Sequence, residues 1–433
     1  MRLQRITLLH RRRAVGLGVV AVLAALGCGV SAASGSTAAK ASAPKVQLRM
    51  ALISNGVTPG VTDAIASFEK AYPKIKIDLT SLGEGQYLST VRTQLAAGTG
   101  PDIFYTPSGS GNPMAIDDIA KAGLAVNLDN QPWAKNVDSM ARAVSGPNGK
   151  IYVWPDGLTG ITAIYNPAIF SGYGLTVPTT WSGVLSYCQA ATAKGLVGFA
   201  YGAQDQTTAM MYALALVAST VYGPHPNYNA TVEDGKANLT KSAGWASALN
   251  KVLAMQKAGC FNPSPAGTTF PAAIGTFLSA KAGAMVWINA IAGSFEAESK
   301  GQLKLASFPL PASDNPAANY TAVFPGGGFA INAHSSHQQQ AEEFLSYLAR
   351  RTVAAKLFKE SDEVSAFTNV TVKPSANQAP VLAALEHGKA GGLPFWNNDQ
   401  TQNAMIAGIQ SLLAGQGTVA DVLAQMQATI PVR

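Results

Sequence analysis

Hydrophobic and polar positions in the first third of the chain follow two spacings, one typical of strands and the other typical of helices. Residues 46–54, VQLRMALIS, form an apolar run that predicts a strand, and KIKIDLT, residues 74–80, alternates as a second strand. Other apolar residues recur every three or four positions, as on one face of a helix: Val61, Ile65, Phe68 and Tyr72, then Tyr87, Val91 and Leu95. With DIFYTP, residues 102–107, as a third strand, the order predicts a parallel sheet covered by helices.

The stretch QLAAGTGPDIFY, residues 94–105, turns abruptly from the second helix into the third strand. Gly98 accepts the left-handed backbone that ends a helix. Ligands of open α/β sheets bind beyond the carboxyl ends of the strands, so the loop after this strand, with Ser108, points toward any cleft. Asp102 stands at the opposite end of the strand, and we expect its carboxylate to cap a nearby backbone amide.

The rest of the 433 residues continues the alternation of helices and strands. Helices are predicted over 207–221 and 242–258, and FLSAKAGAMVWIN, residues 277–289, predicts a helix that leads into a buried strand. YTAVFPGGGFAIN, residues 320–332, predicts a strand, a glycine turn and a strand, and QQQAEEFLSYLAR, residues 338–350, predicts a helix. The length and the pattern together indicate two α/β units.

The N-terminus has the pattern of an export signal. A basic segment precedes the apolar run AVGLGVVAVLAALG, residues 14–27, which is too short for a membrane span of about 20 residues. Cys28 follows, so that AALGC resembles a bacterial lipoprotein cleavage site, where the cysteine is acylated; the alternative is ordinary cleavage after Ala33. We expect a signal peptide over 1–27 and a flexible tether of small, polar residues over 28–44.

Charge and cysteine content bear on the function class. The formal charge of +7 falls to +2 without the first 27 residues, which hold five arginines and no acid. So small a charge gives no basic face for nucleic acid. The remaining cysteines, Cys188 and Cys260, either form a disulfide, which an exported protein permits, or stay as two buried thiols, and we expect no catalytic role for them.

Six blocks of the chain, with consistent spacing, are similar to the family 1 extracellular solute-binding proteins of ABC importers, the group that includes maltose-binding protein. The blocks are FEKAYPKIKI (68–77), QLAAGTGPDIFY (94–105), AIYNPAIFSGYGLTVPTTW (163–181), FLSAKAGAMVWI (277–288), GGGFAIN (326–332) with AEEFLSYL (341–348), and SLLAGQGTVADVLAQMQ (411–427). They span nearly the whole chain that follows the export signal.

The resemblance implies an α/β, two-lobed fold of the type II periplasmic binding proteins, with a ligand cleft between lobes that a hinge joins. It places lobe one at 45–153 plus 303–352, and lobe two at 154–302 plus 353–433. The implied function is a non-catalytic lipoprotein that delivers a mono- or oligosaccharide to the transmembrane subunits of an ABC importer. We expect no cofactor, no metal and a monomer, held by lipid at the outer face of the bacterial cytoplasmic membrane, or free in the periplasm or cell-wall space if it is not lipidated.

A sugar cleft needs flat aromatic faces against the ring C–H groups and planar polar side chains that bind the hydroxyls. Trp396, in GLPFWNND, aligns with a tryptophan that stacks on sugar in the maltose-binding relatives; the alternative is a tryptophan that packs in the core of lobe two. Asp205 matches a family carboxylate in a cleft loop, with a helix N-cap as the alternative. Glu84 follows the second strand, where family members often carry an acid that contacts the ligand.

The other ligand candidates follow a strand or lie near the expected hinge and cleft: Asn55, Gly56, Ser108, Trp154, Asp156, Asn289 and Gly327. For Asn55 and Gly56 the alternative is a simple turn. Gly327, within the triple glycine, lets the backbone approach a ligand, or else belongs to a tight turn. Ile291 stands where family members often carry a stacking tryptophan, while Trp287 falls earlier in the strand, and this departure argues against maltose itself.

Two other functions fit the same features. The first keeps the fold but binds a polyamine, peptide or phosphate ester, although cleft loops poor in arginine disfavour anions. The second is a secreted glycoside-acting enzyme, which needs two carboxyl groups beside the bond, with Asp205 and Glu84 as the pair. The sequence has no HExxH motif, nucleophile elbow or phosphate loop, and HSSH, residues 334–337, is typical of a solvated helix start.

Overall fold

The computed structural model describes residues 46–110, 114–300, 302–392, 396 and 399–430. The predicted signal peptide, residues 1–27, and the whole predicted tether, residues 28–44 with Cys28, lie outside these residues. Within the described ranges, no helix is both long enough and apolar enough to cross a membrane.

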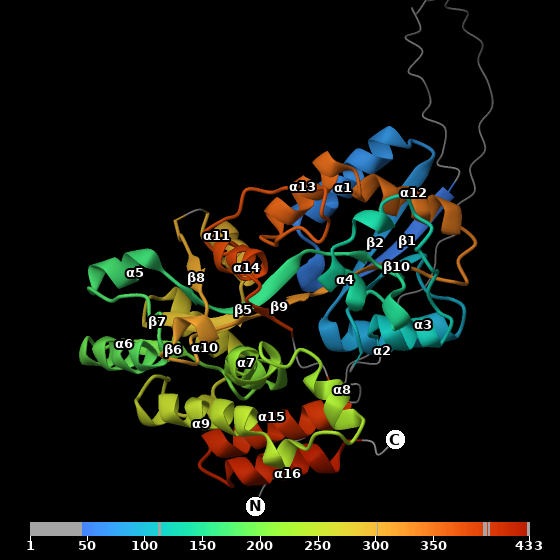
Figure 1. The fold of residues 1–433 in the computed structure, drawn as a ribbon. Helices are drawn as coiled ribbons and strands as arrows, with labels where there is room; N and C mark the ends of the chain where they lie inside the picture. The colour runs from blue at the N-terminus through green and yellow to red at the C-terminus, as the bar shows by residue number, and fades with distance from the viewer. Residues whose placement is uncertain (1–45, 111–113, 301, 393–395, 397–398, 431–433) are drawn as a thin grey trace, which may run out of the picture. The chain divides into compact units, whose positions relative to one another are not determined.

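The first sheet has five strands, in the order β2-β1-β3-β10-β4 (Figure 1). Its strands are β1 (Val46–Ile53), β2 (Ile75–Leu82), β3 (Ile103–Pro107), β4 (Trp154–Pro155) and β10 (Gly327–Ile331). β1 pairs in parallel with β2 and β3, whereas β10, from far along the chain, pairs antiparallel with β3 and β4. The predicted β-α-β-α-β unit is therefore confirmed.

Two helices cover this unit with the faces that the apolar spacing predicts. The buried residues include Val61, Ile65 and Phe68 on α1 (Pro59–Ala71), and Tyr87, Val91 and Leu95 on α2 (Glu84–Ala96). α1 begins after Thr58, whose hydroxyl accepts a hydrogen bond from the Val61 amide at 3.3 Å. Gly98 has φ +70°, the left-handed backbone expected where α2 ends.

The second sheet has the order β11-β9-β5-β7-β6, with β8 paired to β5. Its strands are β5 (Leu158–Tyr165), β6 (Val197–Ala200), β7 (Ala282–Ile288), β8 (Ala306–Phe308), β9 (Thr321–Pro325) and β11 (Ala390–Gly391). β5 is buried along almost its whole length and pairs antiparallel with β7, β8 and β9. Two sheets covered by helices confirm the predicted α/β class.

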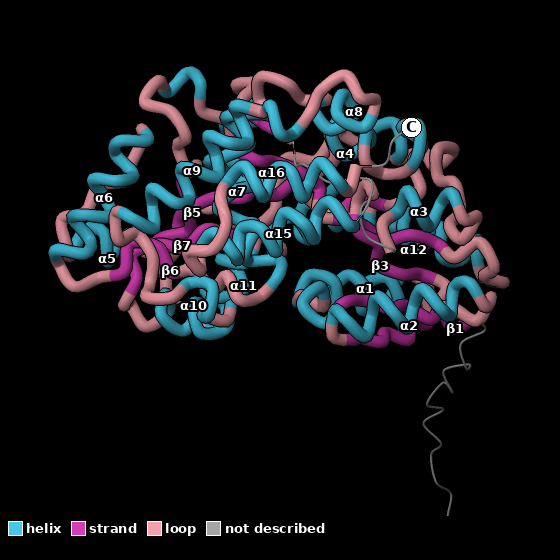
Figure 2. Tube along the Cα trace, turned by 90° about the horizontal axis from the view of Figure 1, so that it is seen from below, coloured by secondary structure: helices cyan, strands magenta, loops and turns pink. Residues whose placement is uncertain are grey.

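The remaining α-helices connect and cover the sheets. From the middle of the chain come α3 (Ile116–Lys121), α4 (Ser139–Ala143), α5 (Pro167–Gly172), α6 (Trp181–Ala193), α7 (Gln206–Val217), α8 (Tyr228–Glu233), α9 (Ala243–Lys257), α10 (Phe270–Leu278) and α11 (Ile291–Glu298). Later come α12 (Gln338–Leu348), α13 (Arg351–Glu360), α14 (Ala379–Glu386), α15 (Asp399–Leu413) and α16 (Val419–Ala428). The C-terminal helices α15 and α16 lie beside α7 and α9, far earlier in the sequence (Figures 1 and 2).

Strand pairing departs from the predicted lobe boundaries in three places. β8 and β9 pair with β5, so these strands belong with the second sheet, although 303–352 was expected in lobe one. β4 pairs with β10 in the first sheet, and α13 packs on α1, although both were expected in lobe two. Apolar patterns could not reveal this, because β9 and β10 are nearly continuous in the chain yet enter different sheets. The division of the other segments stays a prediction.

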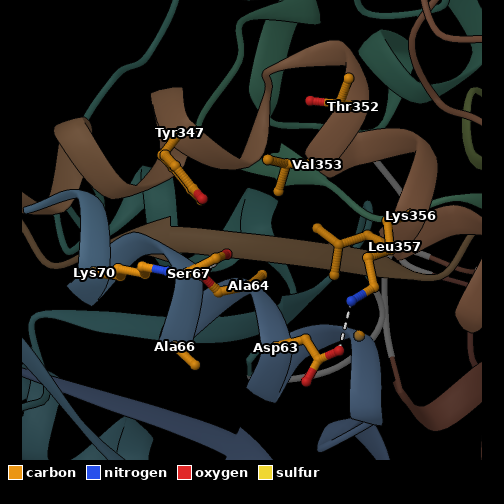
Figure 3. A pocket seen from close by; sticks show the side chains of 11 residues that line it. Asp63, Ala64, Ala66, Ser67, Lys70, Tyr347, Thr352, Val353, Lys356 and Leu357 are labelled. Carbon is orange, nitrogen blue, oxygen red and sulfur yellow. Dashed lines mark hydrogen bonds and ion pairs between the residues drawn. The ribbon is translucent and has the colours of Figure 1, made fainter.

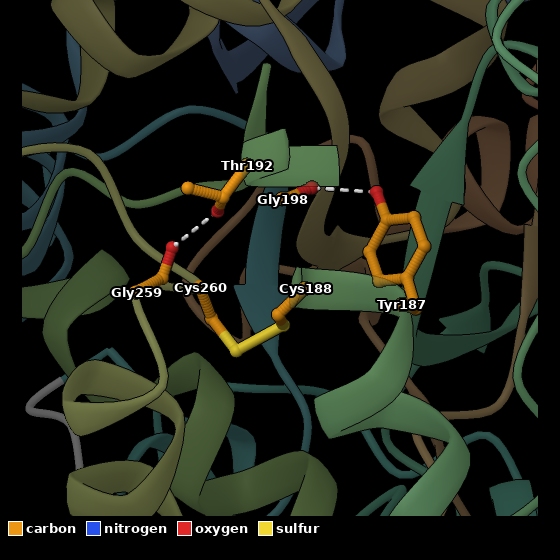
Figure 4. The surroundings of a disulfide bond; sticks show 6 residues. All are labelled: Tyr187, Cys188, Thr192, Gly198, Gly259 and Cys260. Carbon is orange, nitrogen blue, oxygen red and sulfur yellow. Dashed lines mark hydrogen bonds between the residues drawn. A yellow bond between two sulfur atoms is a disulfide. The ribbon is translucent and has the colours of Figure 1, made fainter. Parts of the chain in front are cut away.

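Cys188 and Cys260 form a disulfide in the apolar cluster around the second sheet, with their sulfur atoms 2.08 Å apart (Figure 4). Cys188 lies on α6, Cys260 follows α9, and neither is exposed. Beside the bond, the Tyr187 hydroxyl donates to the carbonyl of Gly198 at 2.7 Å. The bond therefore joins α6 to the segment that follows α9, and of the two expected alternatives the structure has the disulfide.

Candidate ligand site at the crossings between the sheets

Three segments cross between the parts of the chain that form the two sheets. The first crossing, residues 156–157, joins β4 to β5, and the second crossing, residue 326, joins β9 to β10. The third crossing, residues 361–378, joins α13 to α14, which packs on β5, β8 and β9. Any change in the relative orientation of the two sheets has to be accommodated in these short segments.

Backbone hydrogen bonds hold the three crossings beside one another. The Asp156 amide donates to the Gly327 carbonyl at 3.0 Å, which links the first crossing to the second. Leu158 and Val364 exchange two backbone hydrogen bonds, of 2.6 and 2.9 Å, which link the first crossing to the third. The crossings therefore form one small junction rather than three separate linkers.

Glycine is required at the second crossing because neighbouring atoms come very close. A Cβ on Gly327 would lie 2.5 Å from the Tyr105 hydroxyl oxygen and from the Thr106 carbonyl oxygen. A Cβ on Gly328 would lie 2.3 Å from the Trp154 carbonyl oxygen. The predicted glycine turn is thus wrong: the glycines carry the chain from one sheet straight into the other between β3 and β4.

Two carboxylates and one phenol gather at this junction. Asp156 Oδ1 accepts a hydrogen bond from the Gly327 amide at 2.8 Å, and the Tyr105 hydroxyl also bonds to the Asp156 carboxylate. Glu363 Oε2 accepts a hydrogen bond from the Gly157 amide at 3.3 Å. Each acid therefore binds the backbone of a crossing other than its own.

Burial and neighbouring negative charge raise the pKa of both acids. Burial is the main cause that raises the pKa of Asp156 well above its usual value, and the charge of Glu363 adds to it, against the hydrogen bonds from Gly327, Gly326 and Tyr105. Burial likewise raises the pKa of Glu363, against hydrogen bonds from Ser361 and Gly157, and the charge of Asp362 raises it further. The charge of Glu363 on Asp156 links the titration of the two acids, and the pair retains a proton more readily than free carboxyls do.

Tyr105 joins the predicted residue Glu84 to this junction. Burial raises the pKa of Tyr105, and the charges of Asp156, Glu363 and Glu84 raise it further, so the phenol stays protonated and able to donate. Glu84 itself is exposed, at the first position of α2, on the side where β2 ends. The side of the junction that faces Tyr105 and α2 is consequently acidic.

Trp154 and Asn289 occupy structural positions instead of the expected ligand contacts. The Trp154 ring stacks between Phe329 and Phe358, at centroid distances of 5.9 and 5.8 Å, and is 2% exposed. Asn289 is fully buried, and its Oδ1 accepts from the Gly160 amide at 2.7 Å and from the Thr159 hydroxyl at 2.8 Å. Both predictions are corrected, because the Trp154 ring packs among aromatic rings and the Asn289 side chain binds Gly160 and Thr159.

Trp396 is also buried rather than presented to a ligand. Its side chain is 0% exposed and belongs to the apolar cluster of the second sheet, together with Met405 and Ile409 of α15. The structure therefore has the alternative considered for this residue, a tryptophan in the core of lobe two. Its place in a loop rich in glycine and proline gave no sign of how deeply the ring is packed.

Asp205 fastens one helix to another. It precedes α7, but its Oδ2 accepts a hydrogen bond from the amide of Phe270, the first residue of α10, at 2.5 Å. The exposed Asp205 side chain therefore acts as a helix cap, which was the expected alternative to ligand contact. The helix that it caps is α10 and not α7, which follows it in the chain. Asn55 and Gly56 lie in a short 3-10 turn after β1, where Gly56 is exposed and the Asn55 side chain lies outside the described residues.

Four predicted residues do come together at the junction. Asp156 and Gly327 are part of it, Glu84 acts on it electrostatically, and the Ser108 amide donates to the Gly326 carbonyl at 3.4 Å. Tyr105 and Glu363 were missed. Tyr105 stands at the end of the third predicted strand, which was a usable signal, whereas no pattern in the sequence marks Glu363.

Asp102, at the other end of β3, has the structural role that its position predicts. Its Oδ2 accepts a hydrogen bond from the Arg49 amide at 2.7 Å, and its Oδ1 accepts one from the Ser335 hydroxyl at 2.6 Å. His337 Nδ1 lies 3.5 Å from the same Oδ1. Asp102 therefore ties β1 and the segment before α12 to β3, and this cluster lies away from the crossings. Across the described residues, no group of three or more potential ligands is placed to hold a metal ion.

A surface pocket of about 480 Å³ lies between α1 and α13 (Figure 3). Among its lining residues, Asp63 and Lys356 form an ion pair at 2.5 Å across it, and both side chains are about half exposed. No predicted ligand residue lines this pocket, and both helices pack in the apolar cluster of the first sheet. A smaller pocket of about 230 Å³ borders Glu363 and α14, which gives water a path to the junction.

Comparison with known proteins adds solved structures of the same architecture. A protein from a study of xylan utilization by Caldanaerobius polysaccharolyticus is 22% identical, with a TM-score of 0.75 over 89% of this chain and 100% of that one. RafE from Streptococcus pneumoniae is 20% identical, with a TM-score of 0.70 over 90% and 98%. The GacH receptor of Streptomyces glaucescens is 17% identical, with a TM-score of 0.72 over 89% and 97%. These similarities concern the fold, which is the predicted two-lobed one.

No curated protein sequence matches the chain. A family model, described as bacterial extracellular solute-binding protein, matches residues 54–355. The match covers both sheets' central strands and the first two crossings. Since it extends over well more than half of the chain, the protein belongs to the bacterial extracellular solute-binding proteins.

Proposed function

We propose that this protein captures a carbohydrate outside the cell and delivers it to the transmembrane subunits of an ABC importer. Family membership supports the capture of a solute. The observation that carries the proposal is the junction itself, where short crossings join two helix-covered sheets beside polar groups that can bind hydroxyls. A binding protein of this kind needs no reactive group, and we propose that it is not an enzyme.

The chemistry of the junction suits a hydroxyl-rich ligand. Carboxylates such as Glu84 accept hydrogen bonds from sugar hydroxyls, and Ser108 lies beside the second crossing. Each hydroxyl that is desolvated without a partner costs about 1–3 kcal/mol, so a sugar site requires several such groups. Two of the similar structures support this choice by their ligands, since RafE was solved with raffinose and GacH with acarbose.

The mechanism follows from the crossings. A ligand that contacts both lobes only in the closed arrangement shifts the protein toward that arrangement. Closure is expected as a hinge movement, because few residues link the sheets and these absorb the change in dihedral angles. The closed protein then presents its solute to the importer.

The cellular placement rests on the sequence. The basic and apolar N-terminal segment supports export, and Cys28 directly after it supports acylation. The tether would then hold a monomeric binding protein at the outer face of the cytoplasmic membrane. Mass spectrometry of the protein purified from membranes, with Cys28→Ala as the comparison, tests this: loss of the lipid adduct and release into the medium are expected. A wild-type protein cleaved after Ala33 would refute the anchor.

The experiment for the solute is isothermal titration against raffinose, stachyose, xylo-oligosaccharides, chitin oligosaccharides and acarbose. We expect at least one carbohydrate to bind, and Glu84→Gln to weaken it about tenfold, because a charged hydrogen bond contributes about 1.5–3 kcal/mol. Asp78→Asn, which neutralises an exposed acid on the neighbouring strand β2, is the matched control and should bind like the wild type. Failure of every carbohydrate would refute the proposed ligand class.

A polyamine is the second candidate, because every charged group that acts on Tyr105 is an acid. Spermidine and putrescine in the same titration distinguish the two classes. A polyamine that binds where no sugar does would replace the carbohydrate proposal and keep the binding protein.

A further inference from the structure

Asp156 and Glu363 are arranged so that each acid ties together two crossings. Asp156, in the first crossing, holds the amide of Gly327 just after the second one at 2.8 Å. Glu363, in the third crossing, holds the amide of Gly157 in the first one at 3.3 Å. The Asp156 and Glu363 side chains thus link the same crossings that backbone hydrogen bonds already link. Within the described residues, the chain passes between the sheets only at these crossings.

The space around the two acids leaves little freedom. A Cβ on Gly157 would lie 2.3 Å from Glu363 Cβ, and a Cβ on Gly326 would lie 3.3 Å from Asp156 Oδ2. The crossings approach these side chains so closely that only glycine fits at 157. A change in the separation of the two carboxylates must therefore move the backbone of the crossings.

The charges that face the pair come from several elements. Tyr105 of β3 bonds to Asp156, the charge of Glu84 at the start of α2 acts on Tyr105, and the charge of Asp362 acts on Glu363. Tyr87 of α2 holds the Tyr105 carbonyl through its hydroxyl at 2.6 Å. The charged side chains named here are all acids, so a proton is what reduces the repulsion.

We propose that Asp156 and Glu363 are positioning residues that form a proton-dependent link between the crossings and thereby set how readily the lobes close. With a proton on the pair, both acids keep their amide partners and the crossings stay together. When the pair is fully ionised, each carboxylate is the stronger acceptor for its amide, but the two charges repel each other. The crossings then open more readily, and the Gly157 and Gly327 amides lose part of their protection. The last step, from the crossings to solute affinity, rests on the proposed function.

The direction with pH follows from the raised pKa values of both acids. A carboxyl whose pKa is raised by folding stabilises the folded state below the ordinary carboxyl pKa of about 4, and this contribution is lost as pH rises through the raised value. The link should accordingly be tight in mild acid and loose in mild alkali. The pocket beside Glu363 allows the proton to exchange with water.

The first test needs no ligand. Hydrogen exchange of the segments 154–160 and 325–331 is measured in the whole protein from about pH 5 to about pH 8, corrected for the intrinsic rate. We expect protection to fall about tenfold across this range, the change that one pKa unit of coupling produces. In Glu363→Gln, which keeps an acceptor for Gly157 but carries no charge, protection should stay nearly constant with pH.

The matched control is Glu360→Gln, which removes one negative charge three residues away on the exposed end of α13. It should keep the wild-type pH dependence. Equal pH profiles for wild type, Glu363→Gln and Glu360→Gln would overturn the proposal, whether or not Glu363→Gln alters overall stability.

The second test uses raffinose, or whichever carbohydrate the titration panel identifies, as the probe. We expect its Kd to rise about tenfold from about pH 5 to about pH 8 in the wild type and in Glu360→Gln, and to stay flat in Glu363→Gln. If no carbohydrate binds, the proposed function fails while the exchange result still stands. If a sugar binds with a pH dependence that Glu363→Gln leaves unchanged, the link to closure is refuted.

Discussion

The disulfide region and the crossings fasten distant parts of the chain in opposite ways. Cys188 and Cys260 are fully buried and joined by a covalent bond, so α6 and the segment that follows α9 cannot separate. At the crossings, partly buried Asp156 and Glu363 hold backbone amides through hydrogen bonds that respond to protons. A binding protein needs both kinds of region, because rigid lobes turn a small change at the junction into closure.

The difference is also one of packing. The disulfide lies among apolar side chains of the large cluster around the second sheet. The junction instead has glycines at 157, 326 and 327, two acids and a phenol. Hydrogen bonds exchange with water at small net cost, whereas apolar packing and a disulfide do not, so we place the proposed hinge at the junction.

Replacing both cysteines by serine should produce the largest effect. The bond closes a loop with a sequence separation of 72 residues, and loop entropy predicts a loss of about 4 kcal/mol in the free energy of unfolding. Urea unfolding of Cys188→Ser/Cys260→Ser measures this loss. Wild-type protein treated with a reductant also lacks the disulfide and provides a second measurement. A loss below about 1 kcal/mol would mean that the second lobe is held by packing alone, and the contrast with the crossings would weaken.

Gly327→Ala tests the opposite side of the comparison. The new methyl group would overlap the Thr106 carbonyl oxygen and the Tyr105 hydroxyl oxygen, each 2.5 Å away. Because the backbone carbonyl cannot move easily, we expect the free energy of unfolding to fall by about 2–3 kcal/mol. Gly85→Ala is the matched control, because a Cβ there meets no atom within 4 Å and the residue lies in α2. That variant should be neutral or more stable in the same urea experiment. Equal stability of the two variants would contradict the close approach at the second crossing.

The sequence predicted the parts of the fold that depend on local patterns. The apolar faces of α1 and α2 and the parallel pairing of β1, β2 and β3 follow from spacing and order alone. The assignment of β8 and β9 to the second sheet did not follow, because strand partners are chosen by tertiary packing. Asp102 was predictable since its role depends on its position at the start of a strand.

The candidate site was less predictable than the fold. The family resemblance predicted stacking on sugar for Trp396, and Trp154 was expected near the hinge and cleft. A large ring gains at least as much by packing in a core, and both are buried. Glu363 escaped notice because it reaches Gly157 only through the third crossing, which no local pattern encodes. Asp156 was found through its place between a predicted strand and the expected hinge, which is a positional signal.

Asp205→Ala should give the smallest change in the free energy of unfolding, and it tests whether Asp205 stabilises the lobe or contacts the ligand. The variant removes the acceptor for the Phe270 amide, so the start of α10 loses a cap that is worth about 1 kcal/mol. Asp205→Asn retains a side-chain oxygen, so its free energy of unfolding in urea should fall by less than half as much as that of Asp205→Ala. If Asp205 only fastens α10, both variants bind the panel carbohydrate with the wild-type Kd. A Kd that rises about tenfold in both variants, with stability hardly changed, would instead move Asp205 from the rigid lobe to the ligand site.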